Sequence, residues 1–283
     1  NATGYGLTSG IESLDEREIK YWKANLKAGN LYVNRGTTGA IVLRQPFGGM
    51  GKSAIGAGRK VGIYNYVTQF VDYNEIKTPS VSRRYNSDLA SFIESCAKTH
   101  NNKEDFEKLG LALQSYYENY ENEFSQEKDY CKVRGEDNHF RYIPLENVLI
   151  RVSSDDTLFE AVSRILAARV AGVHFKVSIE NNKLVKDFLE ANKSELFTSR
   201  DGLVEQSEEK MMKNISSYDR VIYSDIAKVS PDVFKEANKS VTFIVRQKPM
   251  MEGRLELLNY FIEQSVSHSY HRYGNIGARE LNK

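Results

Sequence analysis

The sequence predicts an α/β protein with a parallel sheet in its C-terminal half. Between residues 141 and 250, apolar strand-like runs alternate with helical patterns, and this alternation favours a parallel sheet with right-handed crossovers. A helix followed by a short strand lies near the start of the sequence, and a long helical pattern joins the two parts. We therefore expect three consecutive domains, at 1–84, 85–140 and 141–283.

Composition excludes several classes of function. The 283 residues suffice for about two domains. Thirty-nine Lys and Arg against 38 Asp and Glu give a net charge of +1, so no overall field attracts nucleic acid or an anionic membrane. We expect no nucleic-acid partner and, because no apolar run approaches about 18 residues, no transmembrane segment. Two cysteines, Cys96 and Cys131, are too few for a disulfide scaffold, which predicts a cytoplasmic protein.

The first part of the chain predicts a helix and a strand followed by a glycine-rich loop. Ser13 and Glu16 have the spacing of a helix capping box, and Gly29 is the residue type that ends helices in a left-handed conformation. The expected elements are a helix at 13–28, a strand at 30–34, a tight glycine loop at 36–62 and a partly alternating strand at 64–73.

The pattern from residue 86 onward is helical. Apolar residues recur at helical spacing from Leu89 to Cys96, and again from Phe106 to Phe124. We expect these helices to form a connector that packs against another part of the protein.

The C-terminal part alternates strands with helices. The expected strands are 148–152, 173–179, 221–223 and 241–245. The expected helices are one capped by Ser154 and ended by Gly172, one through Leu184 and Leu189, one at 231–237 and one at 255–262. A polar tail is expected from Glu263 onward.

Two glycine motifs fail the tests for nucleotide binding. Gly48–Ser53 ends like a phosphate-binding loop, but Pro46 stands where that motif needs a glycine, and no buried strand precedes it. Gly56, Gly58 and Gly62 miss the dinucleotide fingerprint by one residue. We therefore interpret this region as a loop in which backbone segments approach closely.

The sequence offers no convincing nucleophile or metal site. Cys96 falls on an apolar helical stripe, where an inert buried thiol is expected. Lys132 could lower the pKa of the neighbouring Cys131, but no partner histidine can be placed. His268 and His271 have metal-like spacing without an acidic or thiol ligand beside them, so a hydrogen-bonding role is favoured. We expect no catalytic residue and no metal site in this sequence.

Three blocks in the first part, taken together, resemble the end of the catalytic domain of aldehyde dehydrogenases. They are Ala2–Gly10, Ala28–Arg35 and Gln45–Gly49. The segment Asn34–Val42 resembles the branch that acts on glutamate γ-semialdehyde. The resemblance covers residues 1–75 strongly.

The tail from Glu263 to Asn275 resembles the C-terminal motif of bacterial bifunctional proline utilisation flavoenzymes. These couple proline dehydrogenase to 1-pyrroline-5-carboxylate (glutamate γ-semialdehyde) dehydrogenase in one chain. The resemblance implies a docking motif that binds upstream domains of the same polypeptide in a homo-oligomer, consisting of Tyr270, His271, Arg272, Tyr273 and Asn275. Its crowded aromatic and hydrogen-bonding residues are typical of an interface.

The resemblance also implies which parts of the site are present. Gly39 and Ala40 would offer backbone N–H groups to the α-carboxylate of the substrate, and Phe47 would pack on its methylenes. In the family the nucleophilic cysteine, its general base, the NAD-binding domain and the FAD-containing domain lie upstream, and neither cysteine here stands in the family's Gly-Gln-x-Cys context. We expect a C-terminal fragment that is inactive alone, with NAD and FAD bound by the parent enzyme.

Residues 141–250 resemble a degenerate, Rossmann-like copy of the family's nucleotide domain. Lys176 stands at the position of the family's ribose-binding lysine, but the segment 221–225 lacks the glycine that admits a pyrophosphate to a helix N-terminus. The resemblance therefore implies a lid and assembly domain that does not bind NAD. The alternative is a stand-alone scaffolding or binding module with a decayed nucleotide-binding fold.

Overall fold

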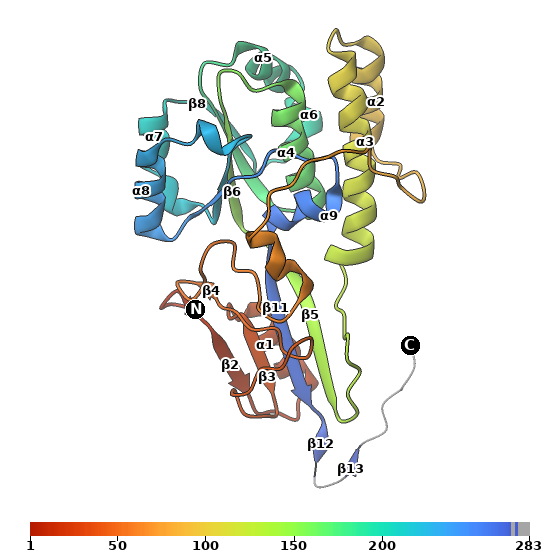
Figure 1. Ribbon diagram of the computed structural model, residues 1–283, viewed down its shortest axis with the longest axis vertical. Helices are drawn as coiled ribbons and strands as arrows, with labels where there is room; N and C mark the ends of the chain where they lie inside the picture. The colour runs from red at the N-terminus through yellow and green to blue at the C-terminus, as the bar shows by residue number, and fades with distance from the viewer. Residues whose placement is uncertain (273–274, 277–283) are drawn as a thin grey trace. The chain divides into compact units, whose positions relative to one another are not determined.

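The computed structural model describes residues 1–272 and 275–276, which form two compact units (Figure 1). Unit 1 comprises Asn1–Val71, Gln126–Ile143 and the chain from Ile262 onward, and unit 2 comprises Asp72–Ser125 and Pro144–Phe261. The two units interleave along the sequence, whereas the expected domains are consecutive. The boundaries at residues 84 and 140 stay a prediction.

Unit 1 is built on a four-stranded sheet. In spatial order its strands are β2 (Thr8–Ile11), β3 (Asn30–Val33), β11 (Phe261–Ser269) and β5 (Glu136–Pro144). β3 runs parallel to both of its neighbours, and helix α1 (Glu16–Asn25) joins β2 to β3. Trp22 and Leu26 pack on a small apolar core of Ala28, Leu31 and Val266. The strand predicted at 30–34 is confirmed.

Helix α1 is shorter than predicted and has a different cap. The carboxylate of Asp15, the residue before the first turn, accepts the backbone N–H of Arg17 at 2.8 Å. Ser13 instead donates its hydroxyl to Glu18 at 2.6 Å. The predicted capping box of Ser13 and Glu16 is wrong because a carboxylate nearer the helix start takes the capping position.

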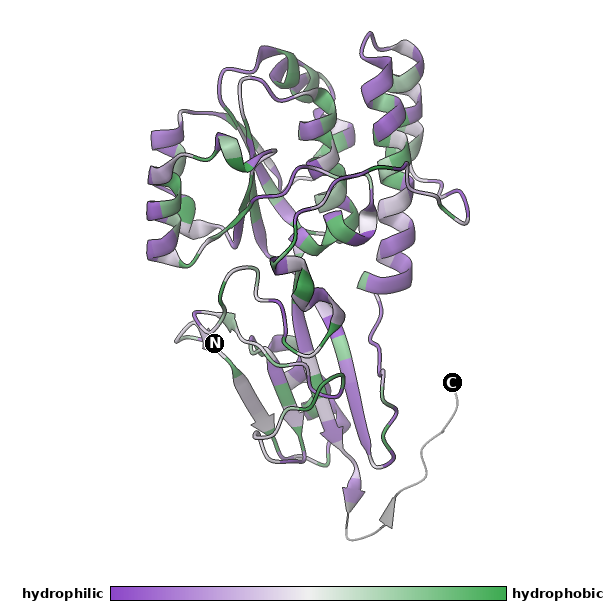
Figure 2. Cartoon of the chain, viewed as in Figure 1, coloured by the Kyte–Doolittle hydropathy of each residue, from purple (hydrophilic) through white to green (hydrophobic). Residues whose placement is uncertain are grey.

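Strand β11 replaces the polar tail predicted from Glu263 onward. Glu263, Ser265 and Ser267 alternate with Gln264 and Val266, and all five are buried. Alternate residues of a strand point to opposite faces of the sheet, so β11 buries polar groups on both faces. Figure 2 shows β11 mostly in hydrophilic colours. A strand without apolar–polar alternation lacks the usual sequence signal, which explains the wrong prediction.

The glycine-rich region at 36–62 is a loop, as predicted. Within it β4 (Met50–Gly51) pairs antiparallel with β1 (Tyr5–Gly6). A Cβ atom on Gly29 would lie 1.8 Å from the carbonyl oxygen of Gly48. The close approach expected from the glycines is therefore present.

The segment Tyr64–Gln69 is a 3₁₀ helix and not the predicted strand. Its buried residue is Asn65, whose side-chain amide donates to Tyr142 and to Glu263, both at 2.8 Å. The residues around it are largely exposed. Because Asn65 is buried while its neighbours are largely exposed, the segment lacks the alternation of a half-buried strand and forms a turn instead.

Unit 2 contains a five-stranded sheet whose strands all run parallel. In spatial order they are β10 (Phe243–Val245), β9 (Arg220–Ile222), β6 (Asn147–Val152), β7 (His174–Ile179) and β8 (Gly202–Glu205). The connections contain α4 (Leu158–Ala171), α5 (Lys183–Ala191), α6 (Lys193–Leu196), α7 (Glu208–Met212) and α8 (Pro231–Ser240). The predicted parallel sheet is confirmed. Its order reverses between β6 and β9, where such sheets usually bind ligands.

Unit 2 also contains two helices that lie side by side next to this sheet (Figure 1). They are α2 (Asp88–Thr99) and α3 (Lys103–Asn119), and α3 continues into a π turn at Tyr120–Phe124. α3 packs against α2, α4 and the short helix α9 (Gly253–Glu256). The predicted helices are confirmed, although residues 136–140 of the expected connector begin β5 and a 3₁₀ turn at Leu257–Tyr260 follows α9. Within the described ranges no helix is both long and apolar enough to cross a membrane.

Candidate substrate-anchoring site

The residues predicted to bind a carboxylate lie in the loop that follows β3, residues 34–47, here called the anchor loop. Gly39 and Ala40 are adjacent at its exposed tip. Within the described chain, neither backbone N–H group has a hydrogen-bond partner. Gly39 has a φ of 81°, and no atom lies within 4 Å of the place where its Cβ would be. The tip therefore presents two successive N–H groups, an arrangement that can bind an anion.

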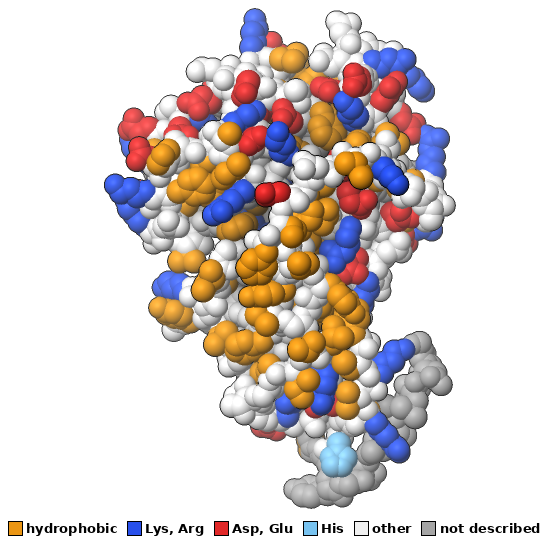
Figure 3. Space-filling view, in the orientation of Figure 1, with side chains coloured by type: hydrophobic (Ala, Val, Ile, Leu, Met, Phe, Trp, Pro, Cys, Tyr) orange, Lys and Arg blue, Asp and Glu red, His pale blue; other side chains and the backbone are white. Residues whose placement is uncertain are grey.

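Phe47, the third predicted site residue, lies at the other end of the anchor loop. Its N–H donates to the carbonyl of Val61 at 2.9 Å, and its carbonyl accepts from the N–H of Val61 at 2.8 Å. The side chain is 38% exposed. Figure 3 shows hydrophobic side chains gathered on one face of unit 1. The exposed hydrophobic residues of this unit include Ile41, Val42, Tyr64, Val67 and Phe70. The backbone of Phe47 is thus fixed while its ring remains accessible.

Glu136 of β5 contacts both ends of the anchor loop. Its Oε2 atom lies 3.0 Å from a guanidinium nitrogen of Arg35, and its Oε1 atom lies 3.0 Å from one of Arg44. The side-chain amide of Gln45 donates to Oε1 at 2.7 Å. Burial alone would raise the pKa of Glu136, but hydrogen bonds and the two arginines lower it below its ordinary value. Glu136 is therefore an anion at neutral pH.

Gln45 connects the supports of the loop to its tip. Its side chain is buried, and its amide also donates to Asn138 at 2.7 Å and to Ser267 at 3.3 Å. Its Oε1 atom accepts the N–H of Ile41, the residue after Ala40, at 3.2 Å. The position of the tip thus depends on side chains from β5 and β11.

The backbone on either side of Phe47 is held from below. Asn30 and Ser265 both donate to the carbonyl of Pro46, at 3.0 and 2.6 Å. The ammonium group of Lys60 donates to the carbonyl of Gly48 and, at 3.1 Å, to the side chain of Asn30. These bonds fix the direction in which Phe47 leaves the backbone.

Lys60 is completely buried and belongs to a charged cluster. Burial lowers its pKa to about 7, and the negative charge of Glu263 opposes this shift. The Glu263 carboxylate accepts the N–H of Lys60 at 2.8 Å and lies 3.5 Å from a nitrogen of Arg59. The buried carboxylate therefore contacts the Arg59 guanidinium, the backbone N–H of Lys60 and the side-chain amide of Asn65.

The first turn of α4, at the switch point of unit 2, is occupied by side chains of the unit itself. The Thr157 hydroxyl accepts the N–H of Glu160 at 3.1 Å, and the Glu160 carboxylate accepts the N–H of Thr157 at 2.8 Å. Asp105 accepts the N–H of Phe159 at 3.3 Å. The predicted cap, Ser154, is wrong because this complete capping box forms three residues later.

These contacts do not fit a dinucleotide. Its pyrophosphate requires free N–H groups at the helix N-terminus, whereas two carboxylates and a hydroxyl already bind the N–H groups of Thr157, Phe159 and Glu160. The nearby Asp156 is buried, accepts from Ser224 and pairs with Lys228. Lys176, at the predicted ribose position, lies on β7 with its side chain against Gly202. We therefore derive no catalytic step in unit 2 through NAD.

The cysteines and histidines are dispersed. Cys96 is half-buried in α2, and burial raises its pKa. Cys131 is half-buried and its backbone N–H donates to the Asp129 carboxylate at 2.9 Å. His268 lies 3.4 Å from the side-chain nitrogen of Asn34. Over the described positions, no three His, Cys, Asp or Glu residues gather where they could hold a metal ion.

The predicted docking motif contacts the loop before β5. The Tyr270 hydroxyl accepts the N–H of Gly135 at 3.0 Å, and the N–H groups of Tyr270 and His271 donate to the Gly135 carbonyl. Arg272 pairs with Asn275 between the short strands β12 (His271–Arg272) and β13 (Asn275–Ile276). Tyr273 lies outside the described residues. Docking of this motif onto other domains stays a prediction.

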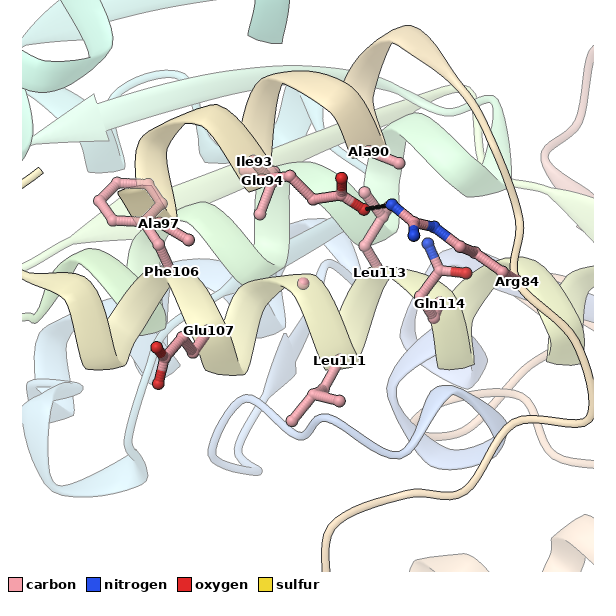
Figure 4. A pocket seen from close by; sticks show the side chains of 11 residues that line it. Arg84, Ala90, Ile93, Glu94, Ala97, Phe106, Glu107, Leu111, Leu113 and Gln114 are labelled. Atoms are coloured by element: carbon pink, nitrogen blue, oxygen red, sulfur yellow. Dashed lines mark hydrogen bonds and ion pairs between the residues drawn. The ribbon is translucent and has the colours of Figure 1, made fainter. Parts of the chain in front are cut away.

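A separate hollow in unit 2 lies between α2 and α3 and encloses about 430 Å³ (Figure 4). Its floor is apolar and includes Ile93, Phe106 and Leu113, and the ion pair of Arg84 with Glu94 lies at its side. Gly110 leaves room within it. This lining offers a packing surface and not a reactive site.

The β2–α1–β3 unit with its glycine-rich loop, together with the doubly wound sheet, has the architecture of an aldehyde-dehydrogenase-like protein. The model of the aldehyde dehydrogenase family matches residues 1–76. The structure is similar to that of proline utilization A (PutA) from Corynebacterium freiburgense, with a TM-score of 0.70 and 30% identity. That match covers 98% of this chain and 24% of the other.

Two curated relatives match the first part of the chain more closely in sequence. The bifunctional protein PutA of Rhizobium meliloti is 48% identical over 71 residues, which are 25% of this chain and 6% of the relative. A 1-pyrroline-5-carboxylate dehydrogenase of Bacillus cytotoxicus is 45% identical over 67 residues, 24% of this chain and 13% of the relative. The predicted resemblance to aldehyde dehydrogenases and to proline utilisation A is confirmed. The chain spans only a small part of the length of these relatives.

The sequence analysis missed the side chains that support the anchor loop. Glu136 and Asn138 lie in a segment expected to be helical, and Ser265 and Ser267 in the expected polar tail. A signal was present in the tail, where Glu263, Ser265 and Ser267 recur with the period of a strand. No local signal marks Glu136, because its partners are distant in the sequence.

Proposed function

We propose that this chain is the C-terminal part of an NAD-dependent dehydrogenase that oxidises glutamate γ-semialdehyde, the open form of 1-pyrroline-5-carboxylate, to glutamate in proline catabolism. The observation that carries the proposal is the pair of unpartnered N–H groups at Gly39 and Ala40. The names of the relatives, PutA and 1-pyrroline-5-carboxylate dehydrogenase, support it.

In this proposal the anchor loop binds the end of the substrate that does not react. The two N–H groups donate charge-assisted hydrogen bonds to the α-carboxylate, and the ring of Phe47 packs on the methylene groups. Holding the carboxylate places the aldehyde at a fixed distance from the loop, which orients it for reaction. The nucleophilic cysteine, NAD and the FAD of proline oxidation belong to other domains of a longer, cytoplasmic and homo-oligomeric polypeptide.

Unit 2 serves as a lid and assembly domain in this proposal. The occupied first turn of α4 supports a role without NAD, because Glu160 and Asp105 place negative charge where a pyrophosphate would bind. The docking motif at Tyr270 and His271 would bind the upstream domains of the same polypeptide.

The test is Gly39→Val in the longer enzyme. Valine rarely adopts a φ of 81°, so the turn changes and the carboxylate loses a charge-assisted hydrogen bond, which costs about 1.5–3 kcal/mol. We expect KM for glutamate γ-semialdehyde to rise about 10- to 100-fold. KM for propionaldehyde, which has no carboxylate, should change little. Equal losses for both substrates would contradict the proposed anchor.

A further inference from the structure

The position of the tip of the anchor loop depends on contacts made outside the tip. Gly36 and Gly39 have no atom within 4 Å of their Cβ positions, and residues 36–42 are exposed. Thr37 lies against Gly10 and Val42 against Gly62, and Gly39 and Ala40 between them are placed through the contacts at the two ends of the loop.

Both ends of the loop converge on one carboxylate. Arg35 leads into the tip, Arg44 and Gln45 lead out of it, and all three bind Glu136 at distances of 2.7–3.0 Å. The Glu136 side chain is 15% exposed, and those of Arg35 and Arg44 are 20% and 28% exposed. Such shielding from water strengthens the attraction between the charges. Glu136 thus closes the base of the loop.

The same carboxylate also controls the electrostatics of the loop. The anchor loop contains two arginines and no acidic residue. Without Glu136, both guanidinium groups would lack their shared partner and would attract any anion that approaches the loop. An arginine binds a carboxylate in its own planar, two-pronged geometry, which differs from that of two successive backbone N–H groups.

We infer that Glu136 is a positioning residue that also determines specificity: by binding Arg35, Arg44 and Gln45 it holds the tip so that the N–H groups of Gly39 and Ala40, and not the arginines, receive the substrate carboxylate. This inference rests on the proposed function for the identity of the substrate. The loop support itself is a property of this chain and can be tested separately.

The variant that tests the support is Glu136→Gln, which keeps the size of the side chain and removes its charge. The matched control is Glu127→Gln. Glu127 also has several cationic partners in unit 1, with Arg141 at 2.9 Å and Lys23 at 3.7 Å. These partners line a different hollow beside α1, and none of them belongs to the anchor loop.

The first measurement is amide hydrogen exchange of residues 36–45 in the 283-residue chain. We expect Glu136→Gln to accelerate exchange of the Ile41 and Gln45 amides about tenfold or more, because opening of the loop governs their exchange. Glu127→Gln should leave these amides unchanged. Ser267→Ala, which removes a smaller contact to Arg35 and Gln45, should give a weaker effect in the same direction. Unchanged exchange in folded Glu136→Gln would overturn the inference.

The second measurement is steady-state kinetics in the longer enzyme. Glu136→Gln should raise KM for glutamate γ-semialdehyde about tenfold, equivalent to roughly 1.4 kcal/mol, while kcat changes less than twofold. The KM of Glu136→Gln for propionaldehyde should remain near that of the wild type. Glu127→Gln should leave both kcat and KM near their wild-type values. Faster exchange with unchanged KM would contradict the carboxylate anchor, and faster exchange with equal losses for both aldehydes would overturn the assigned specificity.

Discussion

Unit 1 and unit 2 each contain backbone N–H groups at a place where an anion could bind, but the hydrogen bonding of these groups differs between the two units. In unit 1 the N–H groups of Gly39 and Ala40 have no partner within the described residues. In unit 2 the groups at the start of α4 are bound by Glu160, Thr157 and Asp105. The comparison teaches that an α/β architecture does not by itself create a binding site, because the side chains next to the N–H groups determine whether a ligand can reach them.

The two units also differ in how they balance buried charge. In unit 1, the buried carboxylate of Glu263 pairs with Arg59, while the buried ammonium group of Lys60 bonds to neutral groups of Gly48 and Asn30. In unit 2, Arg164 and Glu256 form a pair of one cation and one anion, both almost completely buried. Because Lys60 is buried and its pKa is lowered to about 7, unit 1 is sensitive to substitutions and to pH in a way that can be measured. The chain's single tryptophan, Trp22, lies in α1 and reports on unit 1.

The largest expected effect is that of Glu263→Gln. Removing the negative charge takes away the buried carboxylate that the Arg59 guanidinium, the Asn65 amide and the backbone N–H of Lys60 contact, so the free energy of unfolding of unit 1 should fall by about 3–5 kcal/mol. Denaturant unfolding followed by Trp22 fluorescence measures this change. The control is Arg17→Gln, which removes an exposed ion pair with Asp15 in the same unit and should cost far less. Similar losses in both variants would show that the buried cluster contributes nothing special.

The next effect concerns the pH dependence of unit 1. The pKa of Lys60 is about 7 in the folded chain against an ordinary 10.5. Between these values the unfolded chain binds a proton that the folded chain does not, so the free energy of unfolding rises with pH, by up to about 1.4 kcal/mol per pH unit.

Trp22 fluorescence should therefore show a gain of about 2 kcal/mol in the free energy of unfolding between pH 7 and pH 9 from this group. Lys60→Met should remove that gain. If the wild type and the variant show the same slope over this range, Lys60 does not titrate there.

The smallest effect should come from the capping box of unit 2. Thr157→Ala removes the hydroxyl that accepts the N–H of Glu160, and the free energy of unfolding should fall by about 1 kcal/mol. Unfolding followed by far-ultraviolet circular dichroism measures this change. Thr99→Ala, at the exposed end of α2, serves as the control and should cost less than about 0.5 kcal/mol. An equal cost at both sites would remove the contrast between the two sets of N–H groups.

The sequence predicted the sheet and helices of unit 2 because their signals are local. Strand β6 is largely apolar, with Val148, Leu149, Ile150 and Val152 buried, as expected for a parallel strand buried on both faces, and α3 carries a regular apolar stripe. The same criteria failed for β5 and β11 of unit 1. Strands such as β11, with Glu263, Ser265 and Ser267 buried, depend on partners that only the folded chain brings together.

The candidate site also combines residues that belong to a local sequence motif with residues whose partners are distant in the sequence. Gly39, Ala40 and Phe47 could be proposed from the sequence because they fall within a local motif of the resembling family, and their role as a substrate anchor stays a prediction. Glu136 could not, because its role arises from Arg35 and Arg44, which lie roughly a hundred residues away in the sequence and become neighbours only in the folded chain. Local patterns therefore indicate what a loop presents, and the tertiary structure determines how it is held.

The position of β11 in the sheet of unit 1 has a consequence for the order of folding. During synthesis the anchor loop and Lys60 emerge early, whereas Glu263 and the two serines that hold the loop emerge only after the whole parallel sheet of unit 2 has been made. Contacts across such long sequence separations form slowly. We expect unit 2 to acquire its structure first on the ribosome, and the anchor loop, although it is made before unit 2, to mature after it.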